Sequence, residues 1–199
     1  MSDIKSEVIF GHGTNGWNAC LDTYINFSQL ARYYRESANE LLERSVKNTS
    51  KLDVHIYSAV FLYRHSVELF LKDLIWASNC LLGNGKPYPK IHNLVKLWND
   101  LRPKIDLLWK SDGPVDSEPL DKKQLRDVKK LLEEITEYDP ESFSWRYPFD
   151  KEGKRTNSDI HYINVQNLYE RFNQFLDNFE RVLWLFDYLE DAHLNNACG

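Results

Sequence analysis

Residues Val54–Leu82, VHIYSAVFLYRHSVELFLKDLIWASNCLL, decide the fold because they form the most hydrophobic stretch of the chain. Their apolar side chains fall on most sides of a helix, and a helix that is hydrophobic all round is normally enclosed by other helices. Charged residues interrupt the stretch too often for a segment that spans a bilayer. The stretch therefore predicts a buried central helix in a soluble, all-helical protein.

A file of polar side chains runs along this predicted helix. Arg64, Glu68 and Lys72 are four residues apart and share one face, and His65 lies beside them. Buried charges are unfavourable unless they are paired and hydrogen-bonded, so one interpretation is a structural network in which Arg64 and Lys72 neutralise Glu68. The other interpretation is a polar cleft, in which Arg64 binds an anion such as phosphate and His65 acts as acid or base. His92 opens the next helix, where it is either a simple first-turn residue or faces the same polar centre.

Four further segments show helical spacing of apolar residues. We therefore expect an all-α, antiparallel bundle of about five helices. Ser50-Lys51-Leu52-Asp53 predicts a capping box before the central helix, and Pro103 predicts a kink or a break. The expected helices are 18–47, 54–82, 91–110, 120–138 and 162–192, within a single domain (18–192) between a loose leader (1–17) and a C-terminal tail (193–199).

The last predicted helix carries a heptad seam of apolar residues. Such a seam packs inside a helix bundle, or part of it forms a homodimer interface, and the pattern alone allows both. The seam residues are Leu168, Phe172, Phe175, Phe179, Val182, Phe186 and Leu189.

The composition excludes several classes of protein. With 8 Gly and 7 Pro in 199 residues, the chain has little room for the frequent turns of a many-stranded β fold. A net charge of −5 argues against a broad basic surface for nucleic acid but allows a local basic patch. The 3 cysteines are far apart and the first residues lack the pattern of a signal peptide, so we expect a cytoplasmic protein with no membrane partner. Common metal, nucleotide and serine-hydrolase motifs are missing from the sequence, so we expect neither a metal nor a cofactor.

Residues 139–161 form a long irregular segment rich in aromatic residues. A loop of this length in a compact domain is usually functional or disordered, and its aromatic content favours an ordered loop packed on the body. Aromatic and basic groups together also stack and clamp the bases of single-stranded nucleic acid. The candidate binding residues of this loop are Trp145, Arg146, Tyr147 and Asp150, and those of the central polar file are Glu68, Lys72 and His92.

Three stretches in order resemble the HEPN-like helical superfamily. They are YSAVFLYRHSVELFLK (57–72), IHNLVKLW (91–98) after a Gly/Pro loop, and WRYPFD (145–150) before the last helix. The superfamily shares a helix of the type A…E..LK.L, a helix of the type HDL..L and an RYPD element before the last long helix. The resemblance covers residues 53–191 and implies an antiparallel helix bundle that often forms a homodimer.

The resemblance also implies work on RNA. Catalytic members carry an arginine, four to six residues and a histidine near the start of the last helix, and Arg155 and His161 fit with five residues between them. The polar residue after the family's arginine is Asn, whereas this chain has Thr156 there and Asn157 next. The implied function is a metal-independent ribonuclease, or an RNA-binding component, of a prokaryotic toxin or phage-defence system. Arg155 would bind phosphate and His161 would act as general base, paired across a dimer.

In that function, Arg64 and His65 would support or replace the Arg155–His161 pair. The alternative function is a non-catalytic helical module that binds a partner protein, a nucleotide or a small anion at the Arg64, His65, Glu68 and Lys72 cluster. The acidic net charge and the imperfect arginine–histidine motif favour this alternative.

Overall fold

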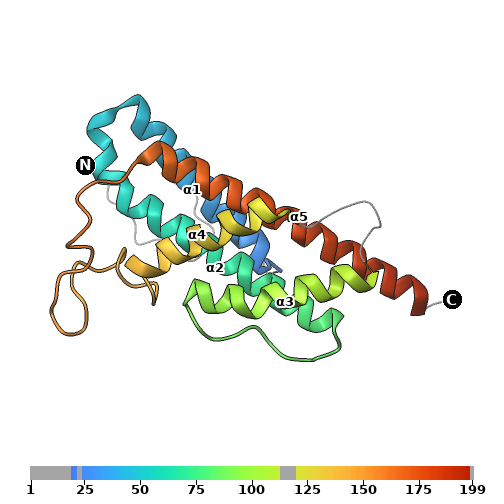
Figure 1. The fold of residues 1–199 in the computed structure, drawn as a ribbon. Coiled ribbons are helices and arrows are strands. Elements are labelled where there is room, and N and C mark those ends of the chain that lie inside the picture. Colours follow the sequence, from blue (N-terminus) through green and yellow to red (C-terminus); the bar gives the residue numbers. More distant parts are fainter. Residues whose placement is uncertain (1–18, 22–23, 113–119, 198–199) are drawn as a thin grey trace, which may run out of the picture.

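The computed structural model describes residues 19–21, 24–112 and 120–197. Within these ranges the chain folds into five α-helices and one short 3-10 helix, with no sheet, so the prediction of an all-helical bundle is confirmed (Figure 1). The expected leader at 1–17 lies outside the described residues. The helices are α1 (Phe27–Lys47), η1 (Thr49–Lys51), α2 (Leu52–Leu81), α3 (Leu94–Asp112), α4 (Lys122–Tyr138) and α5 (Val165–Ala197).

Polar side chains fix the first residues of two helices. Asn26 caps α1 in a capping box with Gln29, so α1 begins later than the expected residue 18. Asp121 and Gln124 form the same arrangement at α4. The capping box expected over residues 50–53 does not form, because residues 49–51 make a 3-10 turn and the hydroxyl of Ser50 donates to Asn48 instead.

Two further boundaries differ from the sequence-based expectation. α3 continues as one helix through Pro103 and is not split there. α5 continues to Ala197, so most of the expected tail at 193–199 is helical. A proline removes one backbone hydrogen bond, and the packed apolar side of α3 (Leu101, Ile105 and Leu108 are buried) keeps the helix together around that loss.

α2 lies at the centre of the bundle and contacts α1, α3 and α5 (Figure 1). The connection 82–93 returns alongside α2 instead of leading away from it. Asn79 Nδ2 donates to the carbonyl of Lys86 near the end of α2, and Arg64 Nη2 donates to the carbonyl of His92 near its middle. Because of this return, α3 runs in the same direction as α2, while α4 runs back against α3 and α5 (Figure 1).

The heptad seam of α5 faces the interior of the bundle. Phe175 and Phe179 stack with ring centroids 4.2 Å apart, and Trp98 of α3 lies against Phe179 at 5.8 Å. The seam therefore packs inside the bundle, as the first of the two interpretations expected. Phe172, Phe175, Phe179, Val182, Phe186 and Leu189 are buried and Leu168 is half-buried.

The inward direction of the seam is testable by truncating one side chain on each face of α5. Phe179→Ala should lower the free energy of unfolding by about 3–5 kcal/mol, because it leaves a cavity beside Phe175 and Trp98. Trp184→Ala, at a position 66% exposed, should change it by about 0.5 kcal/mol or less. Urea unfolding followed by circular dichroism measures both. If Trp184→Ala lowered the free energy of unfolding more than Phe179→Ala, the face of α5 that holds Trp184 would be the one packed in the bundle.

Candidate functional site

The segment between α4 and α5 (residues 139–164, the α4–α5 loop) is fastened to the bundle at its first residue. Asp139 is buried and follows the last turn of α4, where its amide donates to the carbonyl of Ile135. Its carboxylate oxygen Oδ1 accepts hydrogen bonds from the amides of Phe143 and Ser144, at 2.6 and 2.9 Å. The loop therefore starts with a turn that is closed around a buried carboxylate.

Arg64 joins α2 to this turn. Its side chain is 0% exposed, and Nε lies 2.9 Å from Asp139 Oδ2, an ionic contact that falls short of hydrogen-bond geometry. Nη1 donates to Glu68 Oε2 at 2.9 Å and Nη2 to the carbonyl of His92 at 2.8 Å. The guanidinium thus contacts its own helix, the connection before α3 and the α4–α5 loop, and it has no exposed surface for an external anion.

Glu68 is the acceptor at the centre of the polar file. Its Oε1 accepts from Lys72 Nζ at 2.8 Å and lies 2.8 Å from Nδ1 of His92, whose side chain is 52% exposed. Burial alone would raise the pKa of Glu68, but the hydrogen bonds and the positive charges of Lys72 and Arg64 together outweigh burial and hold that pKa below its usual value. The structure therefore gathers Arg64, Glu68, Lys72 and His92 into one network with Asp139.

His65 stands apart from this network, among aromatic rings. Its imidazole stacks on Phe61 with centroids 5.8 Å apart and meets the ring of Tyr34 edge-on at 4.8 Å. Burial lowers the pKa of His65, Glu68 acts in the opposite direction, and Arg64, Lys72 and Arg146 lower it further. Together these effects favour the neutral form of the ring.

The outer part of the α4–α5 loop is shaped by its own polar side chains. Asp150 Oδ1 accepts from the amides of Glu152 and Lys154 at 2.9 and 2.8 Å, which closes a tight turn. Thr156 Oγ1 donates to the carbonyl of Tyr147 at 2.6 Å, and Asn157, at φ +54°, donates through Nδ2 to the carbonyl of Ser144 at 2.8 Å. The side chains of Asp150, Thr156 and Asn157 thus bond the backbone of their own loop and stabilise its shape. For the two polar residues after Arg155, these contacts provide a structural role.

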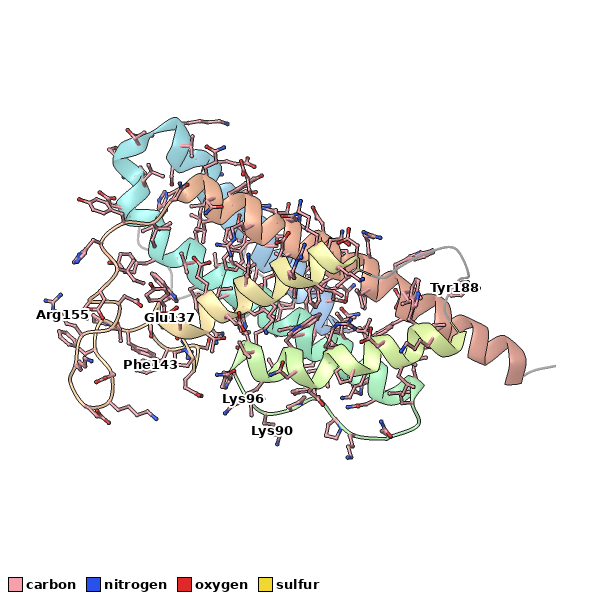
Figure 2. The ribbon with its side chains drawn as sticks, in the orientation of Figure 1. Lys90, Lys96, Glu137, Phe143, Arg155 and Tyr188 are labelled. Atoms are coloured by element: carbon pink, nitrogen blue, oxygen red, sulfur yellow. The ribbon has the colours of Figure 1, made fainter. Side chains whose placement is uncertain are left out.

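The same loop presents aromatic rings paired with cations. The guanidinium of Arg146 lies 5.7 Å from the ring centroid of Tyr147, and it also lies 5.9 Å from that of Phe61 on α2. The guanidinium of Arg155 lies 5.5 Å from the ring of Phe149, and residues 149 and 155 form an isolated antiparallel bridge. Figure 2 shows Arg155 on the outer side of the loop, at one end of the bundle.

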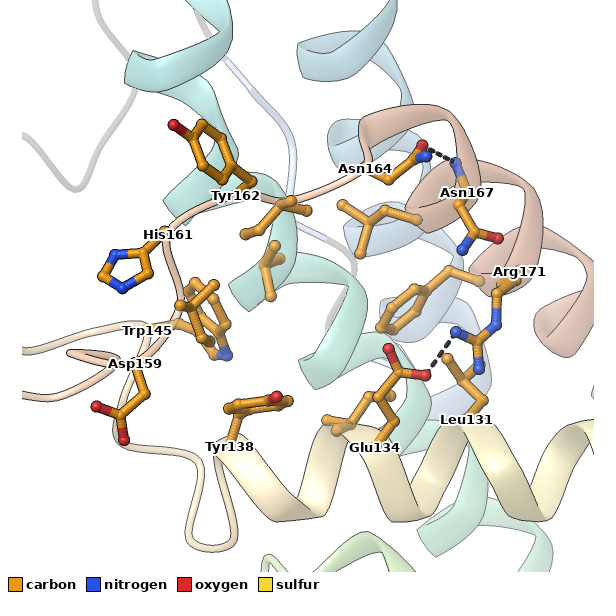
Figure 3. Close-up of a pocket in the computed structure, with 16 residues that line it drawn as sticks. Leu131, Glu134, Tyr138, Trp145, Asp159, His161, Tyr162, Asn164, Asn167 and Arg171 are labelled. Atoms are coloured by element: carbon orange, nitrogen blue, oxygen red, sulfur yellow. Dashed lines mark hydrogen bonds and ion pairs between the residues drawn. The ribbon is translucent and has the colours of Figure 1, made fainter.

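A cavity of about 320 Å³ opens between this loop, α4 and the start of α5 (Figure 3). Trp145, whose ring lies 6.0 Å from that of Tyr57, forms part of its wall, together with buried Phe172. His161 is exposed at its edge. The polar groups around the opening are Glu134, Tyr138, Asp159, Asn164, Asn167 and Arg171.

Arg155 and His161 line different hollows. Arg155 borders a neighbouring hollow of about 240 Å³, which shares Tyr138, Asp159 and Ile160 with the cavity that His161 borders. Both residues precede α5, which begins at Val165, so neither lies on the helix. One chain therefore holds the two candidate catalytic groups on one loop without directing them into a single cavity.

Several residues of the cavity have no signal in the sequence. Glu134 on α4 and Arg171 on α5 form an ion pair at 2.5 Å, and Asn164 Oδ1 caps α5 by accepting from the amide of Asn167. Glu134 and Arg171 are far apart along the chain and each looks like an ordinary surface charge of an amphipathic helix. Only the pairing of α4 with α5 brings them together.

In the described ranges, no group of three or more His, Cys, Asp or Glu side chains is placed to hold a metal ion. None of the helices in those ranges combines the length and the apolar character needed to cross a membrane.

The charge of Glu68 makes a testable contribution to stability. Glu68→Gln should lower the free energy of unfolding at pH 7 by about 3–5 kcal/mol, because it leaves Arg64 and Lys72 buried without their shared carboxylate. The folded-state pKa of Glu68 is depressed below its ordinary 4.5. The difference in the free energy of unfolding between wild type and Glu68→Gln should therefore be complete above about pH 4.5, and it should disappear as pH falls through the folded-state pKa. Urea titrations from pH 7 to pH 3 measure this.

Glu134→Gln is the matched control, because that carboxylate is 55% exposed and its pair with Arg171 contributes little. A difference between wild type and Glu68→Gln that stays constant down to pH 3 would contradict the charged network.

Comparisons of the chain with protein-family models, with curated proteins and with solved structures found no match.

Proposed function

We propose that this chain is a HEPN-like, RNA-acting protein that binds single-stranded RNA along the α4–α5 loop. The observation that supports this best is the pairing of exposed rings with cations: Tyr147 and Phe149 are 49% and 48% exposed, beside Arg146 and Arg155. Such rings stack on bases of any sequence, while the guanidinium groups meet the phosphates. An ordered loop also loses less conformational entropy on binding than a flexible one.

The charge of the loop fits this function within an acidic chain. Residues 146–155 contain four cations and two carboxylates, whereas the whole chain has a net charge of −5. One of the two carboxylates, on Asp150, is occupied by backbone amides of the same turn. The excess of positive charge is confined to this loop, so we expect phosphate binding to be weak at high salt.

The proposed reaction is cleavage of the bound strand without a metal ion. His161 takes the proton of a ribose 2′-hydroxyl, whose oxygen attacks the adjacent phosphorus, and the bond to the 5′-oxygen breaks. Arg155 stabilises the charge that develops on the phosphate oxygens. The products are a 2′,3′-cyclic phosphate and a 5′-hydroxyl that takes up a proton. Such an activity would suit a toxin or phage-defence system, as in the family that the sequence resembles.

Because Arg155 and His161 of one chain border different hollows, Arg155 of one copy would pair with His161 of a second copy in a homodimer. The exposed rings of Trp184 and Tyr188, which stack at 6.2 Å on the outer face of α5, offer apolar surface for such a contact.

Binding is tested with a fluorescent single-stranded oligouridine at low salt. Tyr147→Ala and Phe149→Ala should each raise the Kd roughly 5- to 100-fold, because each removes a stacking platform for one base. Tyr33→Ala, a comparably exposed tyrosine on α1, is the control and should leave the Kd unchanged. Fluorescence anisotropy gives the constants, and equal Kd values for all four proteins would exclude the loop as the binding surface.

Cleavage is tested with the same oligonucleotide in the presence of EDTA. His161→Ala should reduce the rate roughly 100- to 10,000-fold while leaving the Kd nearly unchanged, because the loss of a general base affects only the chemical step. Mixing Arg155→Ala with His161→Ala protein should restore about a quarter of the wild-type rate, since half of the dimers are mixed and each holds one complete site.

Mass spectrometry of the products identifies the cyclic phosphate. Binding without any cleavage by the wild-type protein would leave an RNA-binding protein and remove the catalytic part of the proposal. Cleavage that no mixture restores would show that the two residues do not act across a dimer.

A further inference from the structure

The cavity beside the α4–α5 loop differs in character from the loop itself. The loop is cationic, whereas the cavity combines aromatic walls with carboxylates at its edge (Figure 3). Trp145 is half-buried, and Tyr138 on α4 is 44% exposed. Figure 3 shows Asp159 and Glu134 on either side of the Tyr138 ring. The cavity therefore offers flat apolar surface flanked by hydrogen-bond acceptors.

The charges at the edge of the cavity decide which part of a nucleotide it admits. Arg171 is paired with Glu134 Oε2 at 2.5 Å, so its charge is already neutralised. Asp159 is exposed and adds a negative charge that no cation of the described residues pairs with at salt-bridge distance. Two carboxylates against one cation repel a phosphate and admit a neutral group that carries N–H donors. A nucleobase is such a group, and its phosphates would remain on the cationic loop.

The free acceptors of the two carboxylates suit one base better than the others. Glu134 Oε1 has no hydrogen bond with any residue in the described part of the chain, and Asp159 accepts through Oδ1 only from Ser158, at 3.2 Å. Guanine presents two adjacent donors, N1–H and the 2-amino group, which a single carboxylate accepts side by side. Adenine, cytosine and uracil each present fewer donors on the corresponding edge. The volume of about 320 Å³ lies at the lower end of ligand pockets, roughly 300–1,000 Å³, and suits a single base.

We infer that this cavity is a base-specific subsite that receives one unstacked guanine of a bound RNA strand. The base stacks on Trp145, its N1–H and 2-amino group donate side by side to one of the two carboxylates, Glu134 or Asp159, and the flanking phosphates lie on the cations of the loop. His161 at the edge of the cavity then lies beside the ribose of that nucleotide or of its neighbour. The inference rests on the proposed RNA binding and adds the sequence preference of the site.

The experiment compares pentauridine with pentauridines whose central base is guanine, adenine or cytosine. Anisotropy at low salt should give a Kd roughly tenfold lower for the guanine oligomer than for pentauridine, because a bidentate base contact discriminates by about that factor. This tenfold difference in Kd is the guanine gain. The double variant Glu134→Gln/Asp159→Asn should abolish the guanine gain and leave pentauridine binding unchanged or slightly stronger. Both side chains are exposed, so the substitutions preserve the fold. Trp145→Ala should remove the gain as well.

The matched control is Glu133→Gln/Glu170→Gln, which removes two exposed carboxylates from α4 and α5 outside the cavity and should keep the full gain. Equal binding of all four oligomers by the wild-type protein would overturn the guanine subsite while leaving RNA binding by the loop intact. A guanine gain that survives in Glu134→Gln/Asp159→Asn would overturn it too. Failure of every oligomer to bind would overturn the proposed function and the subsite together.

Discussion

The buried guanidinium of Arg64 is the contact from which the rest of the site is organised. It has 0% exposure and reaches Glu68 on its own helix, the carbonyl of His92 before α3, and Asp139 at the start of the α4–α5 loop. Two cations, Arg64 and Lys72, face two carboxylates, so the cluster is neutral overall. Leaving one such charge without its partner typically costs about 3–5 kcal/mol, which is a large part of the stability of a small domain. The network therefore restricts which conformations the three segments adopt.

From Asp139 onward, the loop is arranged by local contacts that depend on where it starts. Its first turn places Trp145 against Tyr57 and Arg146 over Phe61, so that the loop lies on α2. The hydrogen bonds of Thr156 and Asn157 then fold the outer turn back on the first part. As a result, the exposed rings of the loop and the cavity beside α4 occupy fixed positions relative to each other. Because one buried charge cluster positions both the exposed rings and the cavity, the geometry of the site depends on the stability of the core.

Much of this arrangement was predictable from the sequence. The hydrophobic run at 54–82 and the seam of α5 indicated the buried helices, because apolar periodicity reports directly on packing. The i, i+4 spacing of Arg64, Glu68 and Lys72 indicated their pairing. The return of the connection 82–93 along α2 was not predictable, since it rests on side chain to backbone contacts such as that of Asn79 with Lys86. The role of Asp139 and the pairing of Glu134 with Arg171 were also missed, because each joins segments distant in sequence.

The proposed function makes the α4–α5 loop and its cavity one continuous RNA surface. The most direct measurement is photocrosslinking of the wild-type protein to an oligouridine that carries one 4-thiouridine, followed by mass spectrometry of the linked peptides. Crosslinks at Trp145, Tyr147 or Phe149, which competing unlabelled RNA suppresses, are the predicted result. Crosslinks confined to the second half of α3 or of α5 would contradict it, because those surfaces lie at the opposite end of the bundle from the loop that Arg64 holds in place (Figure 1).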